Sequence, residues 1–317
     1  MASLKDYRDR ISGVKSTRKI TSAMKMVAAA KLRKAQSRAE QSKPYAVRME
    51  RLLARSVTAA PKEQIREIDL LKPVKNEKKR LLIAVSADRG LCGPFNHIVV
   101  KEVKQAIYQL RLEGKKAEIL CIGEKCYDAL KREYGPDIVG HYPLSETFQA
   151  IRQIVSGLIK SYEERLYDRA DLFYNRFENT LKQVPTNHQI IPYVLPDHMG
   201  RGGDEDEALA APQILRSIAD IKPESAADAK SGWYEFEPGS MAILEALIPA
   251  QISAILFNVT LEVAAGEQAA RMTAMDNATR NAKEMISDLT LEYNRVRQAA
   301  ITREVTEIVS AAEAMKS

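Results

Sequence analysis

Apolar residues at alternating spacings of four and three run along the C-terminal part of this 317-residue chain. The segment from Glu267 to Ser317 contains no Gly or Pro, so no helix breaker interrupts it. At about 1.5 Å per residue, a helix of this length is far longer than one globular domain needs. The heptad pattern therefore predicts a coiled-coil seam that a partner helix must cover. The seam positions are Leu261, Ala265, Gln268, Met272, Met275, Thr279, Ala282, Ile286, Leu289, Tyr293, Val296 and Ala300.

The N-terminal part carries a second seam, and we expect it to supply that partner. Strong helix formers and the absence of breakers between Gly13 and Pro44 predict one helix from residue 3 to about 57. Successive spacings of three after Val14 predict a stammer, which is a local overwinding of the coiled coil. Two terminal helices that each have a seam to bury predict antiparallel pairing. The expected seam consists of Leu4, Tyr7, Ile11, Val14, Thr17, Ile20, Met24 and Val27.

Between the two helices, short β-branched runs alternate with helical stretches. This alternation predicts an open α/β sheet with helical crossovers. The expected strands cover residues 80–86, 117–123, 138–141, 171–177 and 189–195, and the expected helices cover 96–112, 124–134 and 147–167. The predicted fold class is α/β, with an antiparallel coiled coil of long N- and C-terminal helices and a central Rossmann-like domain.

The predicted domains are an N-terminal coiled-coil helix at residues 1–58, a Rossmann-like domain at 74–238 and a C-terminal coiled-coil helix at 239–317. Residues 197–238 hold ten acidic and four basic side chains, and we expect them to form a surface loop, with a strand at 233–238 that rejoins the sheet.

Charge is distributed unevenly along the chain. Residues 1–55 hold fifteen Lys and Arg against four Asp and Glu, whereas residues 240–317 hold seven against ten. A basic arm favours an acidic partner surface, and nucleic acid is one candidate for such a partner. The arm has only Tyr7 and Tyr45 as aromatic side chains for base stacking, and its basic residues lie beside an apolar seam. A protein partner is therefore the favoured interpretation, and we expect no nucleic acid.

The residues with reactive side chains do not form a familiar catalytic pattern. The turn from Ser86 to Gly93 resembles a phosphate cradle, yet it lacks the glycine spacing of dinucleotide-binding and P-loop motifs, so a structural turn is favoured. Cys92, Cys121 and Cys126 are expected to be buried thiols, and the four histidines have no metal-ligand spacing. We expect no cofactor, no metal and no catalytic activity; a nucleotide-dependent enzyme on the α/β sheet is the alternative.

Four segments of the sequence are distinctive as a set. They are RISGVKSTRKITSAMKMVAAAKLRKAQ (10–36), SADRGLCGPFN (86–96), EQAARMTAMDNATRNA (267–282) and LTLEYNRVRQAAITREVTEIV (289–309). These segments closely resemble the gamma subunit family of F-type ATP synthases. The resemblance covers both ends and the intervening domain, with 197–238 falling outside the ordinary bacterial pattern. It implies a non-catalytic rotor shaft that couples proton flow through the membrane c-ring to ATP synthesis in the hexamer of alpha and beta subunits.

The resemblance also implies partners, a location and a contact site. The expected partners are the alpha and beta subunits, the epsilon subunit and the c-ring, at the cytoplasmic face of a bacterial cell membrane, where the chain is peripheral. The N-terminus shows neither a signal peptide nor a transit pattern. In the coupling region implied by the resemblance, Met24 on the first helix faces residues of the second helix, namely Arg271, Gln298, Thr302 and Glu307. From charge alone we add Lys25, Lys31 and Arg33.

Overall fold

The chain folds into two compact units that share two long helices. The computed structural model describes residues 3–61, 65, 67–72, 74, 76–194, 237 and 239–314. One unit consists of Met1–Ala29 with Arg271–Ser317, and the other of Ala30–Ala270. Apart from Glu237, the predicted acidic loop at 197–238 and its strand lie outside the described residues.

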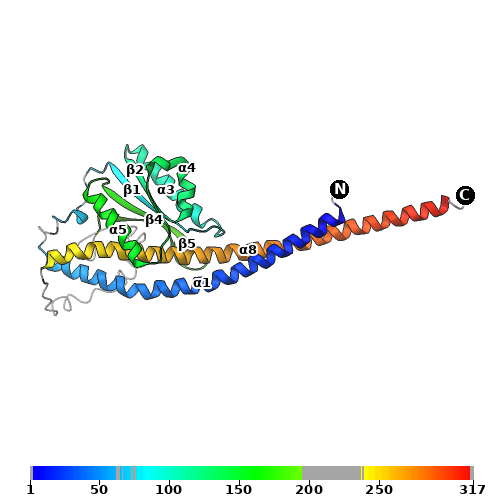
Figure 1. Cartoon of the computed structure of the whole chain (residues 1–317), viewed down its shortest axis with the longest axis horizontal. Helices are drawn as coiled ribbons and strands as arrows, with labels where there is room; N and C mark the ends of the chain where they lie inside the picture. The colour runs from blue at the N-terminus through cyan, green and yellow to red at the C-terminus, as the bar shows by residue number, and fades with distance from the viewer. Residues whose placement is uncertain are drawn as a thin grey trace. The chain divides into compact units, whose positions relative to one another are not determined.

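The two long helices agree with the sequence pattern. Helix α1 runs from Leu4 to Ala59 with Pro44 inside it, and α8 runs from Ser240 to Ala314 with Pro249 inside it (Figure 1). All twelve predicted seam positions of the second helix are buried or half-buried. The coiled-coil seam predicted from the heptad pattern is therefore confirmed.

The second unit contains a five-stranded sheet with the strand order β3-β2-β1-β4-β5. Strands β1 (Lys79–Val85), β2 (Lys116–Ile122), β3 (Ile138–Tyr142) and β4 (Arg169–Phe177) are parallel, and the apolar runs predicted each of them. Strand β5 (Gln183–Ile191) pairs antiparallel with β4. The prediction of this last strand at 189–195 was wrong, because its first half is a polar edge with few buried side chains and gives no apolar signal.

Helices cover both faces of the sheet (Figure 1). Helices α3 (Phe95–Leu112) and α4 (Glu124–Tyr134) pack on one face, around Val103, Leu130 and Ile119. Helix α5 (Phe148–Glu163) and the first half of α8 pack on the other face. Two short 3-10 helices, Asp69–Leu71 and Gly135–Asp137, complete the described elements.

The first half of α8 is a core helix of this unit. By length and composition α8 is able to cross a membrane, since it holds an 18-residue window of mean hydropathy 1.7, but 56% of that window is buried inside the protein. Its buried side chains contact the sheet and α5. They are Leu244, Ile248, Ile252, Ile255, Leu256, Val259 and Val263.

Candidate functional site

In the first unit, three polar contacts set the pairing of α1 with α8. The Arg8 guanidinium donates to the Tyr293 hydroxyl at 2.8 and 3.0 Å, and the Thr279 hydroxyl donates to Thr21 Oγ1 at 2.8 Å. The Lys25 ammonium pairs with Asp276 Oδ1 at 2.6 Å. The residue numbers of each pair add to 300 or 301, so the helices are antiparallel and stay in one register.

The register corrects the expected seam of the first helix. Burial follows positions 4, 7, 11, 14, 18, 21, 25, 28 and 32, where only Arg18 is exposed, so the three-four alternation continues without a stammer. Thr17, Ile20 and Val27 are exposed instead. The prediction failed because this stretch of the seam holds Thr21 and Lys25, whose polar side chains give no apolar signal.

The Lys25–Asp276 pair lies at the edge of the seam. The hydrogen bond from Lys25 is the main cause that lowers the pKa of Asp276 from its usual 3.8, and Arg280 acts in the same direction. Both side chains remain more than a third exposed, so solvent screens the attraction. The pair therefore specifies which residues face each other more than it adds stability.

The outer surface of this part of α1 is unusually apolar for an exposed helix face. Ile20, Met26 and Val27 are 60%, 65% and 55% exposed. Beside them lies a groove of about 520 Å³ with four cationic side chains. Its lining residues are Arg18, Lys19, Ser22, Ala23, Met26, Thr279, Arg280 and Lys283. A surface that combines apolar side chains with cations fits a partner segment that is apolar and acidic.

The structure brings together only some of the predicted contact residues. Met24 is half-buried, and its neighbour Lys25 lies opposite Asp276. Arg271 is buried, five residues before Asp276 in α8. Lys31 and Arg33 are exposed on the part of α1 that belongs to the second unit.

The expectation that Met24 faces Gln298, Thr302 and Glu307 is wrong. In the observed register, Leu4 at the start of α1 lies opposite residue 296 or 297, so these three residues lie near or beyond that end. The C-terminal end of α8 continues past the first residue of α1 (Figure 1), and residues 301–310 are all exposed. Sequence reasoning also missed Asp276 as a contact residue, because a lone acid beside a seam has no distinctive spacing.

Side chains of the turn at Ser86–Gly93 tie it to later parts of the chain. Asp88 Oδ1 accepts from the backbone N–H groups of Glu124 at 3.0 Å and Leu144 at 3.1 Å. Ser86 Oγ accepts from the Cys126 N–H at 2.9 Å. A carboxylate and a hydroxyl of the turn thus cap N-terminal amides of α4, the helix that follows the next strand. These bonds give the turn a structural role, as the sequence favoured.

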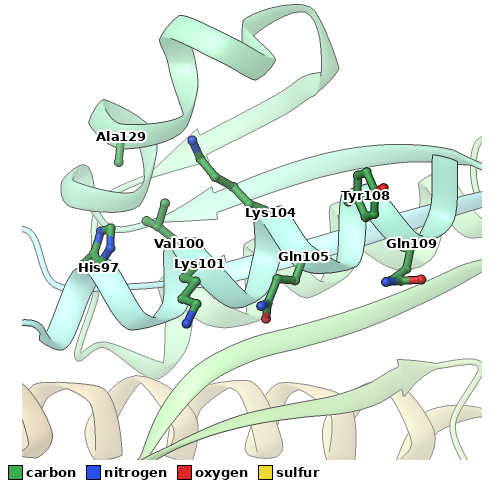
Figure 2. A pocket seen from close by; sticks show the side chains of 8 residues that line it. All are labelled: His97, Val100, Lys101, Lys104, Gln105, Tyr108, Gln109 and Ala129. Carbon is green, nitrogen blue, oxygen red and sulfur yellow. The ribbon is translucent and has the colours of Figure 1, made fainter. Parts of the chain in front are cut away.

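A groove with polar side chains lies on the outer side of α3. It has a volume of about 840 Å³ and is lined by His97, Lys101, Lys104, Gln105 and Tyr108 together with Val100, Gln109 and Ala129 (Figure 2). Lys104 forms an ion pair with Glu133 of α4, and the lining side chains include no nucleophile paired with a base. Within the described residues, no group of three or more His, Cys, Asp or Glu is placed to hold a metal ion.

Comparisons with known proteins agree over the full length. The family profile described as ATP synthase matches residues 3–315. The chain is 44% identical to the ATP synthase gamma chain of Paracoccus denitrificans and 41% identical to that of Rhodospirillum rubrum, in each case over 99% of this chain and 100% of the relative.

Solved structures show the same fold. The central stalk and c-ring structure of the Tetrahymena thermophila mitochondrial ATP synthase contains a chain with 25% identity and a TM-score of 0.56, over 82% of this chain and 99% of that one. A chain of the Euglena gracilis mitochondrial ATP synthase, at 18% identity and a TM-score of 0.60, covers 98% of this chain and 94% of its own length. The second likeness supports the fold alone.

Proposed function

Because this chain belongs to the family of ATP synthase gamma chains, we propose that it is the central rotor shaft of a proton-translocating F-type ATP synthase. The observation that carries this proposal is the full-length likeness at 44% identity, together with an antiparallel coiled coil at the two chain ends. The shaft makes and breaks no bonds. It passes rotation from the membrane c-ring to the catalytic sites of the surrounding subunits.

The proposed partners follow from the same family and from the chemistry of the coiled coil. A hexamer of alpha and beta subunits surrounds the paired helices, and the α/β domain contacts the epsilon subunit and the c-ring. A coiled coil is stiff because backbone hydrogen bonds run along both helices. Its two faces differ in charge and apolar content, so three chemically equivalent catalytic sites meet different surfaces as it turns.

The contact surface that we assign to this function includes Met24, Lys25 and the groove beside them. Ile20 and Val27 add apolar contacts, and the cations add attraction to acidic loops that salt weakens. Arg271 supports this surface from α8, whereas Gln298, Thr302 and Glu307 contact the hexamer nearer to the end of the shaft. Lys31 and Arg33 act as further exposed cations. As its location we propose the cytoplasmic face of a bacterial cell membrane, with the chain peripheral to it.

Reconstitution tests the function directly. The chain is combined with alpha, beta and epsilon subunits and with a membrane sector in vesicles, and ATP hydrolysis and proton uptake are measured together. We expect hydrolysis-driven proton uptake that depends on the chain. Hydrolysis by the complex without any proton uptake contradicts the proposed shaft.

A substitution tests the contact surface separately. Met24→Lys places a second ammonium beside Lys25 at a half-buried position, so we expect fewer protons pumped per ATP while hydrolysis continues. Met24→Leu is the control, since it keeps the apolar character and size and is expected to pump normally. An unchanged pumping ratio in Met24→Lys removes Met24 from the surface without affecting the assignment of the shaft.

A further inference from the structure

Phe148, the first residue of α5, contacts both long helices within the second unit. Its ring lies 6.0 Å from the Tyr45 ring of α1 at an interplanar angle of 79°. It lies 5.4 Å from the Phe257 ring of α8 at an angle of 87°. Both arrangements are edge-to-face, which is the favourable geometry for aromatic pairs. One side chain that belongs to the layers around the sheet therefore links α1 with α8.

A second contact binds the same segment to α1. Glu146, two residues before Phe148, forms an ion pair with Arg38. Arg38 and Tyr45 are seven residues apart, so they lie on the same face of α1, two helical turns from each other. The segment that leads into α5 thus contacts one face of α1 at two points.

Both long helices contribute buried side chains to the core of the α/β domain. Helix α8 buries seven aliphatic side chains against the sheet and α5, as described above. Among the described side chains of α1, Leu53 belongs to the buried part of that core and Val57 packs against it. Near Phe148, a cleft of about 740 Å³ opens between α5 and the two helices and includes Arg152 and Ser156 in its lining. The aromatic contact of α5 with α1 is therefore made at its first residue.

Both long helices carry a proline close to Phe148. Pro44 precedes Tyr45 in α1, and Pro249 lines the cleft together with Phe148. Each proline lacks the N–H that the i→i−4 ladder needs, so the backbone of each helix loses one hydrogen bond. The Ser253 hydroxyl donates to the Pro249 carbonyl at 2.8 Å, which adds a side-chain bond at this point. On α1 the ring contact at Tyr45 therefore directly follows the residue where the ladder loses a bond, whereas on α8 the ring contact at Phe257 lies eight residues after Pro249.

We propose that Glu146 and Phe148 transmit torque from the α/β domain to α1. We call these two residues the torque key: Glu146 pairs with Arg38, and Phe148 contacts Tyr45 of α1 and Phe257 of α8. Load applied to the domain reaches α8 through its buried face and reaches α1 through Arg38 and Tyr45. Without the key, twisting load reaches α1 through its remaining contacts, which include the buried contact at Leu53 and the hydrogen bond from Ser42 to Asn258 of α8. This inference rests on the proposed function, because a torque key matters only in a chain that transmits rotation.

Torsional stiffness of the assembled rotor tests the key. The alpha and beta hexamer is fixed to a surface, the rotor is stalled with a non-hydrolysable ATP analogue, and a bead reports angular fluctuations. Lys101→Cys, which is exposed on α3, attaches the bead, since Cys92, Cys121 and Cys126 are buried. We expect Phe148→Ala to raise the angular variance roughly twofold, because one of the two contacts of the key with α1 is lost while the Arg38–Glu146 ion pair remains. Phe148→Tyr keeps the ring and is expected to match the wild type.

Substitutions in the Arg38–Glu146 ion pair, which lies at the surface, test the key independently of Phe148. Glu146→Arg repels Arg38 and is expected to raise the variance, while the exchanged pair Arg38→Glu with Glu146→Arg restores it. Tyr127→Ala is the matched control, because it removes a half-buried ring that stacks on His141, away from both long helices.

The outcomes separate the key from the proposed function. Unchanged variance in Phe148→Ala and in Glu146→Arg overturns the key, and so does an equal rise in Tyr127→Ala. If Phe148→Ala does not assemble, Glu146→Arg and its exchanged partner decide the result. A wild-type chain that assembles without rotating contradicts the proposed shaft instead.

Discussion

Gly266 of α8 lies against a buried aromatic ring, and adding one methyl group there tests that packing. A Cβ at this position lies 2.9 Å from Phe95 Cε2 and 3.2 Å from Cζ. Phe95 is 2% exposed, and its carbonyl accepts from Asn175 Nδ2 at 2.6 Å, so the ring has little freedom to move away. Gly266→Ala therefore tests how closely α8 packs against α3.

The expected magnitude is the difference between two opposing effects. Alanine in a helix interior is favoured over glycine by about 0.5–1 kcal/mol. Forcing an extra methyl into a packed core costs about 1–3 kcal/mol. The second effect is larger, so we expect Gly266→Ala to lower the free energy of unfolding by about 1 kcal/mol.

Gly13 is the matched control, because it is a helical glycine of α1 with no atom within 4 Å of an added Cβ. Gly13→Ala is expected to be stabilising by about 0.5–1 kcal/mol. Hydrogen exchange measured by mass spectrometry reports the opening free energy near each site, which separates the two units in a chain that need not unfold in one step. If Gly266→Ala slows exchange as much as Gly13→Ala does, the ring yields to the methyl group and the reasoning is refuted.

Two further predictions concern polar contacts. Asp276 has a lowered pKa in the folded chain, so its contribution to the free energy of unfolding is complete above the usual value of 3.8 and is lost as the pH falls through the folded value. Lys25→Ala is expected to remove this contribution to the acid dependence, measured by urea unfolding at pH 2–5. An unchanged dependence on pH contradicts the ion pair. Asp88→Ala leaves the N–H groups of Glu124 and Leu144 without their acceptor and is expected to lower the free energy of unfolding by about 1–3 kcal/mol. Asp88→Asn keeps an acceptor oxygen and is expected to lower it by less. Thermal denaturation of both variants measures the difference. Equal melting temperatures for the two Asp88 variants disprove that role.

Much of the fold could be predicted because its strongest signals are local. Four parallel strands and the helices between them come from apolar runs and helix formers, and the long C-terminal seam comes from a heptad free of Gly and Pro. The edge strand β5 was placed too late along the chain, because a polar edge strand is defined by its hydrogen bonds to β4.

The contact site was predicted less well, since its residues depend on the register between two helices. The resemblance and the charge pattern predict Met24 and Lys25 as contact residues, but Gln298, Thr302 and Glu307, which were expected to face Met24, lie near or beyond the start of α1. Register follows from which polar side chains meet across the seam, and spacing within one helix carries no information on that.

By itself, the sequence determined that this chain has two long helices with seams to bury and an α/β domain between them, because helix propensity and hydrophobic period act within short windows. The tertiary structure alone decided which face of α1 turns inward between Val14 and Leu32. The positions of apolar residues in α1 favour Ile20 and Val27 as seam residues. Thr21 and Lys25 lie at the seam instead, because Thr279 forms a hydrogen bond with Thr21 and Asp276 forms an ion pair with Lys25. That choice leaves the apolar side chains exposed for a partner, and it depends on residues more than 250 positions away in the chain.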